Sequence, residues 1–333
     1  MQAEGAQDGD AEPQRLAPVA AAETAARLRS NVELALRGKP DVVRRAVECV
    51  VAGGHLLLED VPGVGKTTLA QAIARSINAS FKRIQFTSDL LPSDLVGASV
   101  PNTRSAAGAH FVFQPGPVFA NLVLADEINR ASPKAQSALL EAMSEGAVTV
   151  EGVTHPLPRP FFVIATQNPI EHHGTHPLPE SQLDRFLMRF GIGYPDAANE
   201  LAVLREDPAH TMLPRLQPVL DLEELLGIQA AAGRIKFSDA LADYLLRLVQ
   251  ESRSHDALAV GVSPRGAIAL RRAAQARALV DGRDFCIPDD VRDLAVDVLA
   301  HRVLVDPRAG HNRSAEETAW IIREILEQVS VPL

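Results

Sequence analysis

The chain has 333 residues, which is long enough for two domains that each bury a hydrophobic core. Its composition, 46% hydrophobic and 23% charged, is typical of a soluble globular protein, and its net charge of −9 does not indicate a nucleic-acid-binding protein. Only two cysteines occur, Cys49 and Cys286, which excludes a disulfide framework and fits a reducing cytoplasm.

The N-terminal residues 1–20 are rich in Ala, Gly, Gln, Asp and Pro without periodicity, and we expect them to form a disordered tail. The first residues, MQAEGAQDGDAEPQ, are acidic where a signal peptide would be basic and then apolar. No apolar run reaches the roughly 18 residues needed to span a bilayer. We therefore expect a cytoplasmic chain without a membrane span.

The next part of the chain alternates between helical and strand-like patterns. Apolar residues recur at helical spacing over residues 23–36, 41–51 and 67–77. Short apolar runs lie between and after these segments, at residues 55–58, 81–86, 122–125, 161–165 and 186–192. This alternation predicts an α/β core over residues 21–195, with a parallel sheet wrapped by helices and ligands at the carboxyl ends of its strands.

Beyond residue 195 the strand-like runs stop. Helical patterns follow at residues 221–232, 238–252, 264–279, 288–300 and 315–329. The segment Pro288-Asp289-Asp290 suits a helix start, because proline is tolerated in the first turn and acids favour the helix dipole. The sequence therefore predicts a smaller all-α domain over residues 196–333, with the boundary near residues 195–215.

The segment EDVPGVGKTTLA, residues 59–70, lies between an expected strand and an expected helix. Its spacing is that of a phosphate-binding loop, Gly-x-x-x-x-Gly-Lys-Thr, and the strand–loop–helix context is the one that this motif requires. Asp60 stands where the motif has its first glycine. Because an Asp tolerates left-handed backbone better than most residues, we expect Asp60 to change nucleotide affinity only modestly.

Backbone N–H groups of this loop and the N-terminus of the following helix would bind phosphates. Lys66 would reach the β- and γ-phosphates, and Thr67 would hold Mg²⁺. The alternative, a turn with an incidental lysine, is disfavoured by the motif and its context together. The expected nucleotide-binding residues are Pro62, Gly63, Val64, Gly65, Lys66, Thr67 and Thr68.

Two further strands end in polar residues. In NLVLADE the apolar run ends at Asp126, which would bind Mg²⁺ through water, and Glu127, which would polarise the attacking water. In FFVIATQNP the run leads to Asn168, which would orient that water or touch the γ-phosphate. The alternatives are solvated acids at an ordinary strand end and an Asn-Pro turn.

Five stretches carry a family resemblance in this order: PGVGKTTLA, LADEINRASPKAQSALLEAMSEG, VIATQNPIE, LPESQLDRF and GVSPRGAIALRRAAQA. Together they closely resemble the MoxR family of AAA+ ATPases over about residues 25–310. The resemblance implies an AAA+ P-loop core with helices on both faces of a parallel sheet, followed by a smaller all-α lid domain. The DEINRASPKAQSALLEAM and SQLDRF segments are more specific than the P-loop, and they separate this family from kinases and GTPases.

The resemblance assigns roles only at matching positions. Asn168 would be sensor 1, Arg185 the arginine finger that reaches the neighbouring subunit's γ-phosphate, and Arg265 sensor 2 from the lid. An arginine near a transferring phosphoryl group supplies the charge stabilisation that the reaction needs. Alternatively, Arg185 forms only a surface ion pair, and Arg189 or Arg130 acts across the subunit boundary.

Two stretches fit the family's insertions, and one departs from its pattern. Residues 111–119, with a Pro-Gly turn, and residues 148–157, turning near Glu151-Gly152, read as hairpins. The resemblance implies that such hairpins face the ring's pore or a partner, whereas the sequence alone indicates only hairpins. The loop with His172, His173 and His176 suggests a metal, but no carboxylate or cysteine arrangement completes a site there.

The resemblance implies a Mg²⁺-dependent ATPase that assembles into a ring, expected to be a hexamer. It would act as a chaperone-like factor on protein clients, often with a separate partner that carries a von Willebrand factor A domain. One alternative, a nucleic-acid motor, predicts basic hairpins, whereas residues 111–119 and 148–157 contain no Lys or Arg. The other alternative, a nucleotide-gated scaffold with little turnover, is disfavoured by the presence of Glu127.

Overall fold

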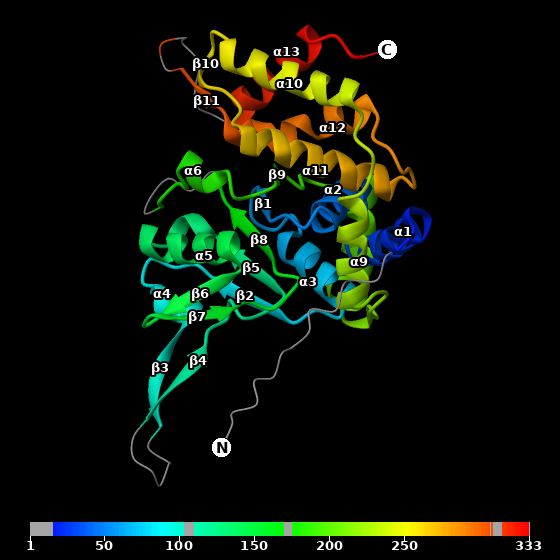
Figure 1. Cartoon of the computed structure of the whole chain (residues 1–333). Coiled ribbons are helices and arrows are strands. Elements are labelled where there is room, and N and C mark those ends of the chain that lie inside the picture. Colours follow the sequence, from blue (N-terminus) through cyan, green and yellow to red (C-terminus); the bar gives the residue numbers. More distant parts are fainter. Residues whose placement is uncertain (1–15, 103–109, 170–174, 307, 309–314, 333) are drawn as a thin grey trace, which may run out of the picture.

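The structure is a computed structural model that describes residues 16–102, 110–169, 175–306, 308 and 315–332. Figure 1 shows an α/β layer in the middle, a layer of helices above it, and a β-hairpin that extends below. The expected tail over residues 1–20 falls mostly outside the described residues. Helix α1 (Pro18–Ala35) already begins at Pro18.

The central sheet has five strands, all parallel, in the order β2-β5-β8-β1-β9. Each strand matches one of the five predicted runs, so the predicted parallel α/β core is confirmed. The strands are β1 (Leu56–Glu59), β2 (Phe81–Gln85), β5 (Leu122–Asp126), β8 (Phe162–Gln167) and β9 (Met188–Phe190).

The two faces of the sheet pack into different hydrophobic clusters. Along β1, Leu56 and Leu58 belong to the first cluster, whereas Leu57 belongs to the second. This alternation of fully buried side chains is expected of a parallel strand that is covered on both faces. The first cluster includes residues of α1, α2 (Pro40–Val51) and α3 (Lys66–Ser76), and the second includes residues of α4 (Pro92–Val96) and α5 (Pro133–Glu145).

The C-terminal part contains the predicted helices, and it also has a short antiparallel ribbon of β10 (Leu258–Val260) and β11 (Leu304–Val305) that the sequence did not predict. None of the described helices is long and apolar enough to cross a membrane. The helices are α7 (Ala197–Glu206), α8 (Pro208–Thr211), α9 (Leu222–Ala232), α10 (Asp239–Ser254), α11 (Pro264–Val280), α12 (Pro288–Leu299) and α13 (Ala315–Gln328). Short helical turns are α6 (Glu180–Leu183), η1 (Ile128–Arg130), η2 (Leu213–Arg215) and η3 (Ala300–Arg302).

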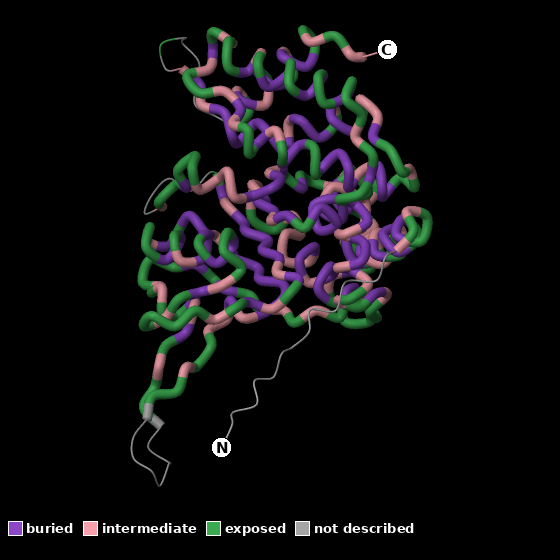
Figure 2. Tube along the Cα trace, in the orientation of Figure 1, coloured by how far each residue is buried: buried purple, intermediate pink, exposed green. Residues whose placement is uncertain are grey.

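The first hydrophobic cluster continues from the core helices into the C-terminal helices. Helix α11 packs on α1 and α2, and α9 packs on the same pair. Arg44 of α2 reaches Asp281 at 2.8 Å, and Arg45 reaches Asp297 at 3.0 Å. Buried residues therefore run without interruption through this region (Figure 2). The division into domains at residue 195 stays a prediction.

The long hairpin differs from the prediction for residues 111–119. Strand β3 (Gly97–Asn102) pairs with β4 (His110–Pro115), so Pro115 ends a strand and the expected Pro-Gly turn is wrong. The cause is close backbone packing. A Cβ added at Gly116 would lie 2.3 Å from the carbonyl oxygen of Leu95. Glycine is needed there to bring the chain back to the core.

The second predicted hairpin is confirmed. Strands β6 (Ala147–Val150) and β7 (Val153–Pro156) pair antiparallel. Glu151 and Gly152 both have positive φ, 51° and 81°, as a two-residue hairpin turn requires. This short hairpin follows directly from α5 and lies beside the base of the long one (Figure 1).

Candidate functional site

The predicted phosphate-binding loop connects the carboxyl end of β1 to α3. Gly65 has φ 100° immediately before the first helical residue, and Gly63 has φ 86° with no atom within 4 Å of an added Cβ. Both positions need glycine because L side chains rarely adopt such angles. All seven expected nucleotide-binding residues, 62–68, are exposed or half-buried along this loop and the first turn of α3.

Lys66 turns its ammonium group back over the loop. Its Nζ donates to the main-chain oxygens of Asp60 at 2.5 Å and Val61 at 3.2 Å. Burial lowers the pKa of Lys66, and the negative charges of Asp60, Asp126 and Glu127 oppose that shift. A bound phosphate would compete with two carbonyl oxygens for this ammonium group, and a charged oxygen is the stronger acceptor.

Asp60 joins the loop to the segment that leaves β9. Its Oδ2 accepts hydrogen bonds from the N–H groups of Ile192 at 2.8 Å and Gly193 at 2.6 Å. Its Oδ1 accepts from Val61 N–H at 2.7 Å. The left-handed backbone that the sequence reasoning allowed for is not found, because Asp60 is not among the described residues with positive φ. The carboxylate has a structural task that a glycine could not perform.

Asp126 is the last residue of β5 and is 8% exposed. Its Oδ1 accepts a hydrogen bond from Thr166 Oγ1 at 2.6 Å, and its Oδ2 accepts one from Arg83 Nη2 at 2.6 Å. Arg83 comes from β2 and Thr166 from β8, so both neighbouring strands hold this carboxylate. Neither Arg83 nor Thr166 was predicted as a partner of Asp126 from the sequence.

Glu127 follows with a left-handed backbone, φ 56° and ψ 49°. Its N–H donates to Thr166 Oγ1 at 2.9 Å, so one buried hydroxyl contacts both acidic residues. The side chain accepts from Gln85 Nε2 at 2.9 Å and pairs with Arg130 at 3.0 Å. Thr166 and Gln85 were missed by the sequence analysis, although the parallel alignment of strand ends could have suggested both.

The oxygen ligands at this edge suit Mg²⁺. Carboxylates of Asp126 and Glu127 and the hydroxyl of Thr67 are the hard donors that Mg²⁺ prefers. Both oxygens of Asp126 already accept hydrogen bonds. These residues therefore fit a Mg²⁺ ion that would keep several water ligands and would also bind the phosphates of a nucleotide. The described residues contain no cluster of three or more His, Cys, Asp or Glu that would form a dedicated site. Of the histidine loop, His172 and His173 lie outside the described residues.

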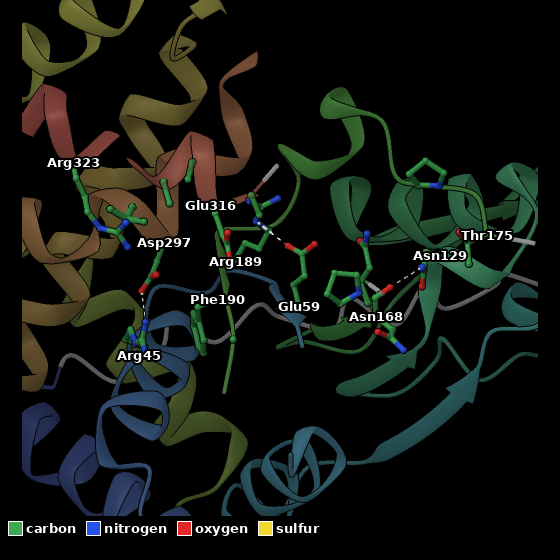
Figure 3. Close-up of a pocket in the computed structure, with 18 residues that line it drawn as sticks. Arg45, Glu59, Asn129, Asn168, Thr175, Arg189, Phe190, Asp297, Glu316 and Arg323 are labelled. Atoms are coloured by element: carbon green, nitrogen blue, oxygen red, sulfur yellow. Dashed lines mark hydrogen bonds and ion pairs between the residues drawn. The ribbon is translucent and has the colours of Figure 1, made fainter. Parts of the chain in front are cut away.

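Asn168 is 5% exposed and lines a cavity of about 1280 Å³ between the sheet edge and the C-terminal helices. Its main-chain oxygen accepts from Asn129 Nδ2 at 3.4 Å. In Figure 3 the cavity lies between Asn168 and Glu59 on the core side and Asp297 and Arg323 on the helical side. The predicted loop, the acidic pair and Asn168 therefore all lie at the carboxyl edge of the sheet.

The two predicted arginines lie elsewhere. Arg185, just after α6, donates from Nη1 to the carbonyl oxygen of Leu140 in α5 and lines a different hollow, of about 540 Å³, with Glu141. Arg265, at the start of α11, has 65% of its side chain exposed and lies 3.6 Å from Asp184. Neither arginine lines the cavity of Figure 3, and of the predicted site residues, all of which the structure describes, only Asn168 does.

The two alternative arginines have partners within the same chain. Arg189 is 14% exposed and lies 3.5 Å from Glu59. Burial lowers the pKa of Arg189, and Glu59 opposes that shift. Arg130 pairs with Glu127 of its own site. Neither arrangement favours a role across a subunit boundary.

Known proteins resemble this chain over most of its length. The family described as "ATPase family associated with various cellular activities (AAA)" matches residues 55–188, and the "AAA lid domain" family matches residues 250–325. The uncharacterized protein YeaC of Bacillus subtilis is 48% identical over 303 residues, 91% of this chain and 93% of that protein. Chaperone MoxR1 of Mycobacterium tuberculosis is 40% identical over 311 residues, 91% of this chain and 81% of that protein.

A solved structure shares the fold. The crystal structure of a protein from Cytophaga hutchinsonii, provisionally named an ATPase, superposes with a TM-score of 0.85 at 36% sequence identity. The match covers 95% of this chain and 97% of the other. The arrangement of core and C-terminal helices is therefore shared with a protein of known structure.

Replacing Asp60 by Ala should lower stability more than nucleotide affinity. The substitution leaves the N–H groups of Ile192 and Gly193 without their carboxylate, and hydrogen bonds to a charged group contribute about 1.5–3 kcal/mol each. The contact of Lys66 uses the main-chain oxygen and is retained. We expect a lower free energy of unfolding in urea and an ATP dissociation constant changed less than about tenfold.

Asp60→Asn is the matched control, because its amide oxygen can still accept a hydrogen bond, and it should fall between wild type and Asp60→Ala. Complete loss of nucleotide binding at unchanged stability would show that the carboxylate contributes to the nucleotide site itself.

Replacing Thr166 by Val should reduce ATP turnover while leaving ATP binding nearly unchanged. Valine has the same shape but removes the hydroxyl that contacts Asp126 and Glu127. Displacing a catalytic group by about 1 Å can cost about a hundredfold in rate, so we expect kcat to fall at least about tenfold. The value of kcat is measured by steady-state phosphate release. Thr166→Ser, which keeps the hydroxyl, should recover most of the rate, and equal rates in the Val and Ser variants would contradict this role.

Proposed function

This chain belongs to the MoxR family of AAA+ ATPases and hydrolyses ATP, and we propose that it does so as the Mg²⁺-dependent subunit of a ring that acts on protein clients. The observation that carries the proposal is the carboxyl edge of the sheet. Lys66 follows the carboxyl end of β1, and Asp126 and Glu127 stand at the carboxyl end of β5. The Thr166 hydroxyl of β8, the strand between these two, contacts both acidic residues. A phosphate-binding loop and a water-activating acid are thus adjacent.

In the proposed mechanism the loop residues 62–68 bind the phosphates through backbone N–H groups, and Lys66 contacts the β- and γ-phosphates. Thr67 and, through water, Asp126 would hold Mg²⁺, which would neutralise phosphate charge. Glu127 polarises the attacking water, and Asn168 orients it or contacts the γ-phosphate. Thr166 and Gln85 fix the orientation of Glu127 through the contacts described above.

The arginine finger is assigned to Arg185 and is supplied to the next subunit. Arg185 contacts the carbonyl oxygen of Leu140 in α5 and not the phosphate-binding loop or the acidic pair of its own subunit, which supports a role in trans. Arg265 contacts Asp184, the neighbour of Arg185, so sensor 2 lies on the same side of the subunit as the finger. We therefore assign Arg265 to the same interface. A closed ring, expected to have six subunits, lets every site receive its arginines from a neighbour.

The client is proposed to be a protein. The relative from Mycobacterium tuberculosis is named a chaperone. The long hairpin exposes apolar side chains, with Phe111 72% and Val112 42% exposed, which suits protein contacts better than a phosphate backbone. A partner with a von Willebrand factor A domain would be a separate chain. The cytoplasmic location stays a prediction, consistent with the two free, buried cysteines.

Replacing Glu127 by Gln tests the water-activating acid. The amide keeps the size of the side chain but cannot accept a proton, and loss of a general base typically costs about 10²–10⁴ in rate. We expect ATP to remain bound and phosphate release to fall by at least about a hundredfold. Equal rates in wild type and variant, with both assembled, would mean that another group activates the water.

Mixing subunits tests the finger. Arg185→Ala subunits keep an intact nucleotide site, whereas Lys66→Ala subunits lack the phosphate-binding lysine but keep Arg185. Each variant alone should be nearly inactive. Mixed rings should recover phosphate release, because an intact site then lies beside an intact finger. Full activity of Arg185→Ala alone, or no recovery on mixing, would rule out a finger that acts in trans.

A further inference from the structure

Arg302, a buried arginine of the C-terminal helices, binds the segment that contains the proposed arginine finger, Arg185. Arg302 ends η3, just after α12, and only 3% of its side-chain surface is exposed. Its Nε donates to Asp184 Oδ1 at 2.8 Å, and its Nη2 donates to the carbonyl oxygens of Asp184 at 3.2 Å and Phe186 at 2.6 Å. Its Nη1 donates to the carbonyl oxygens of Leu187, at 3.2 Å, and Val298. All three nitrogens of the guanidinium group are thus engaged.

His301 adds a second contact to the same segment. Its Nε2 lies 3.0 Å from the carbonyl oxygen of Phe186 and 2.8 Å from Arg302 Nη1. Burial lowers the pKa of His301 well below its ordinary value, and the nearby charge of Arg302 acts in the same direction. We call Arg302 and His301, together with their contacts to residues 184–187, the lid clamp.

The lid clamp holds the backbone on both sides of Arg185. The residue before it, Asp184, and the residue after it, Phe186, each bond to Arg302. The side chain of Arg185 is held separately, by its hydrogen bond to the carbonyl oxygen of Leu140 in α5. The same Asp184 carboxylate also faces Arg265 at 3.6 Å, so the two arginines assigned to the subunit interface share one anchor.

Separating the two sides of the lid clamp is costly. Arg302 has lost nearly all contact with water, and a buried charge that loses its partners is strongly destabilising. The donors are rigid, since the guanidinium group is planar and its N–H directions are fixed. Segment 184–187 and η3 should therefore move as one body, even though about 115 residues separate them in sequence.

We propose that Arg302 is a positioning residue through which the helical lid sets the place of the arginine finger, Arg185. A movement of the lid in one subunit would therefore move Arg185 of that subunit, which would contact the nucleotide site of the neighbouring subunit. The inference rests on the proposed role of Arg185 in trans. It adds that contacts with the lid determine the position of Arg185 as much as contacts with the core do.

The test uses two variants of the lid clamp in the full chain. Arg302→Lys keeps the charge but loses the planar set of donors, and Asp184→Asn removes the charged acceptor from a side chain that is 21% exposed. For both we expect kcat for ATP hydrolysis to fall at least about tenfold, with KM for ATP within about threefold of wild type, since the nucleotide-binding residues of the same subunit are left intact. Arg302→Lys isolates the finger segment, because Asp184→Asn also weakens the contact with Arg265. Size-exclusion chromatography in the presence of ATP checks that each variant assembles as the wild type does.

Subunit mixing separates a displaced finger from general damage. Lys66→Ala subunits, which carry an intact lid clamp and finger, should restore phosphate release to Arg302→Lys and Asp184→Asn subunits, as they should to Arg185→Ala. The double variant Lys66→Ala/Arg302→Lys should fail to restore it. Asp290→Asn is the matched control, because this buried lid carboxylate pairs with Arg283 at 2.6 Å and does not touch segment 184–187. It should keep the wild-type kcat.

The outcomes distinguish the inference from the proposed function. Suppose that mixing restores phosphate release to Arg185→Ala. The inference is then overturned, and the role of Arg185 as finger stands, if the clamp variants keep the wild-type kcat. The same holds if the clamp variants lose activity and mixing does not restore it. If Arg185→Ala is fully active or cannot be restored, the finger itself is wrong and the inference falls with it. Should Arg302→Lys fail to fold, Asp184→Asn decides between these outcomes.

Discussion

The burial of the three middle strands decides where this protein can carry chemistry. Strands β5, β8 and β1 lie between two hydrophobic clusters and are apolar along nearly their whole length. A charged side chain within them would lose its hydration without compensation. Polar groups therefore collect where the strands end, at Asp60, Asp126 and Asn168. Because the strands are parallel, these ends lie at one edge, and short hydrogen bonds between neighbouring strands orient the groups.

The C-terminal helices are fixed to the core in two different ways. Near α1 and α2 the attachment is a continuous hydrophobic cluster supported by the pair of Arg44 and Asp281. Near α6 it is a set of directional contacts around Arg302. Hydrophobic packing tolerates small sliding, whereas a buried guanidinium group with fixed donors does not. The contacts around Arg302 therefore couple movement of the C-terminal helices to movement of segment 184–187, which contains Arg185.

The sequence predicted what depends on local pattern. All five sheet strands, the main helices and the phosphate-binding loop follow from periodicity and from the spacing of Gly63, Gly65 and Lys66. The partners of Asp126 could not be read in this way, because Arg83 and Thr166 come from other strands and meet it only through sheet register. The same holds for Arg302 and Asp184, whose contact spans 118 residues. The wrong turn at Pro115 arose because Pro-Gly also suits a strand end that passes close to another backbone.

The left-handed backbone of Glu127 has a consequence for how this protein balances activity against robustness. An L residue in that region costs about 1 kcal/mol or more relative to an ordinary conformation, and the surrounding hydrogen bonds must hold it there. Glycine at this position would relieve the strain and would also remove the carboxylate. The backbone would thus be less strained without the proposed water-activating acid. The hydrogen bonds from Glu127 N–H to Thr166 and from Gln85 to the Glu127 carboxylate offset that cost, so the same contacts that stabilise the strained residue also hold its carboxylate at the edge of the sheet.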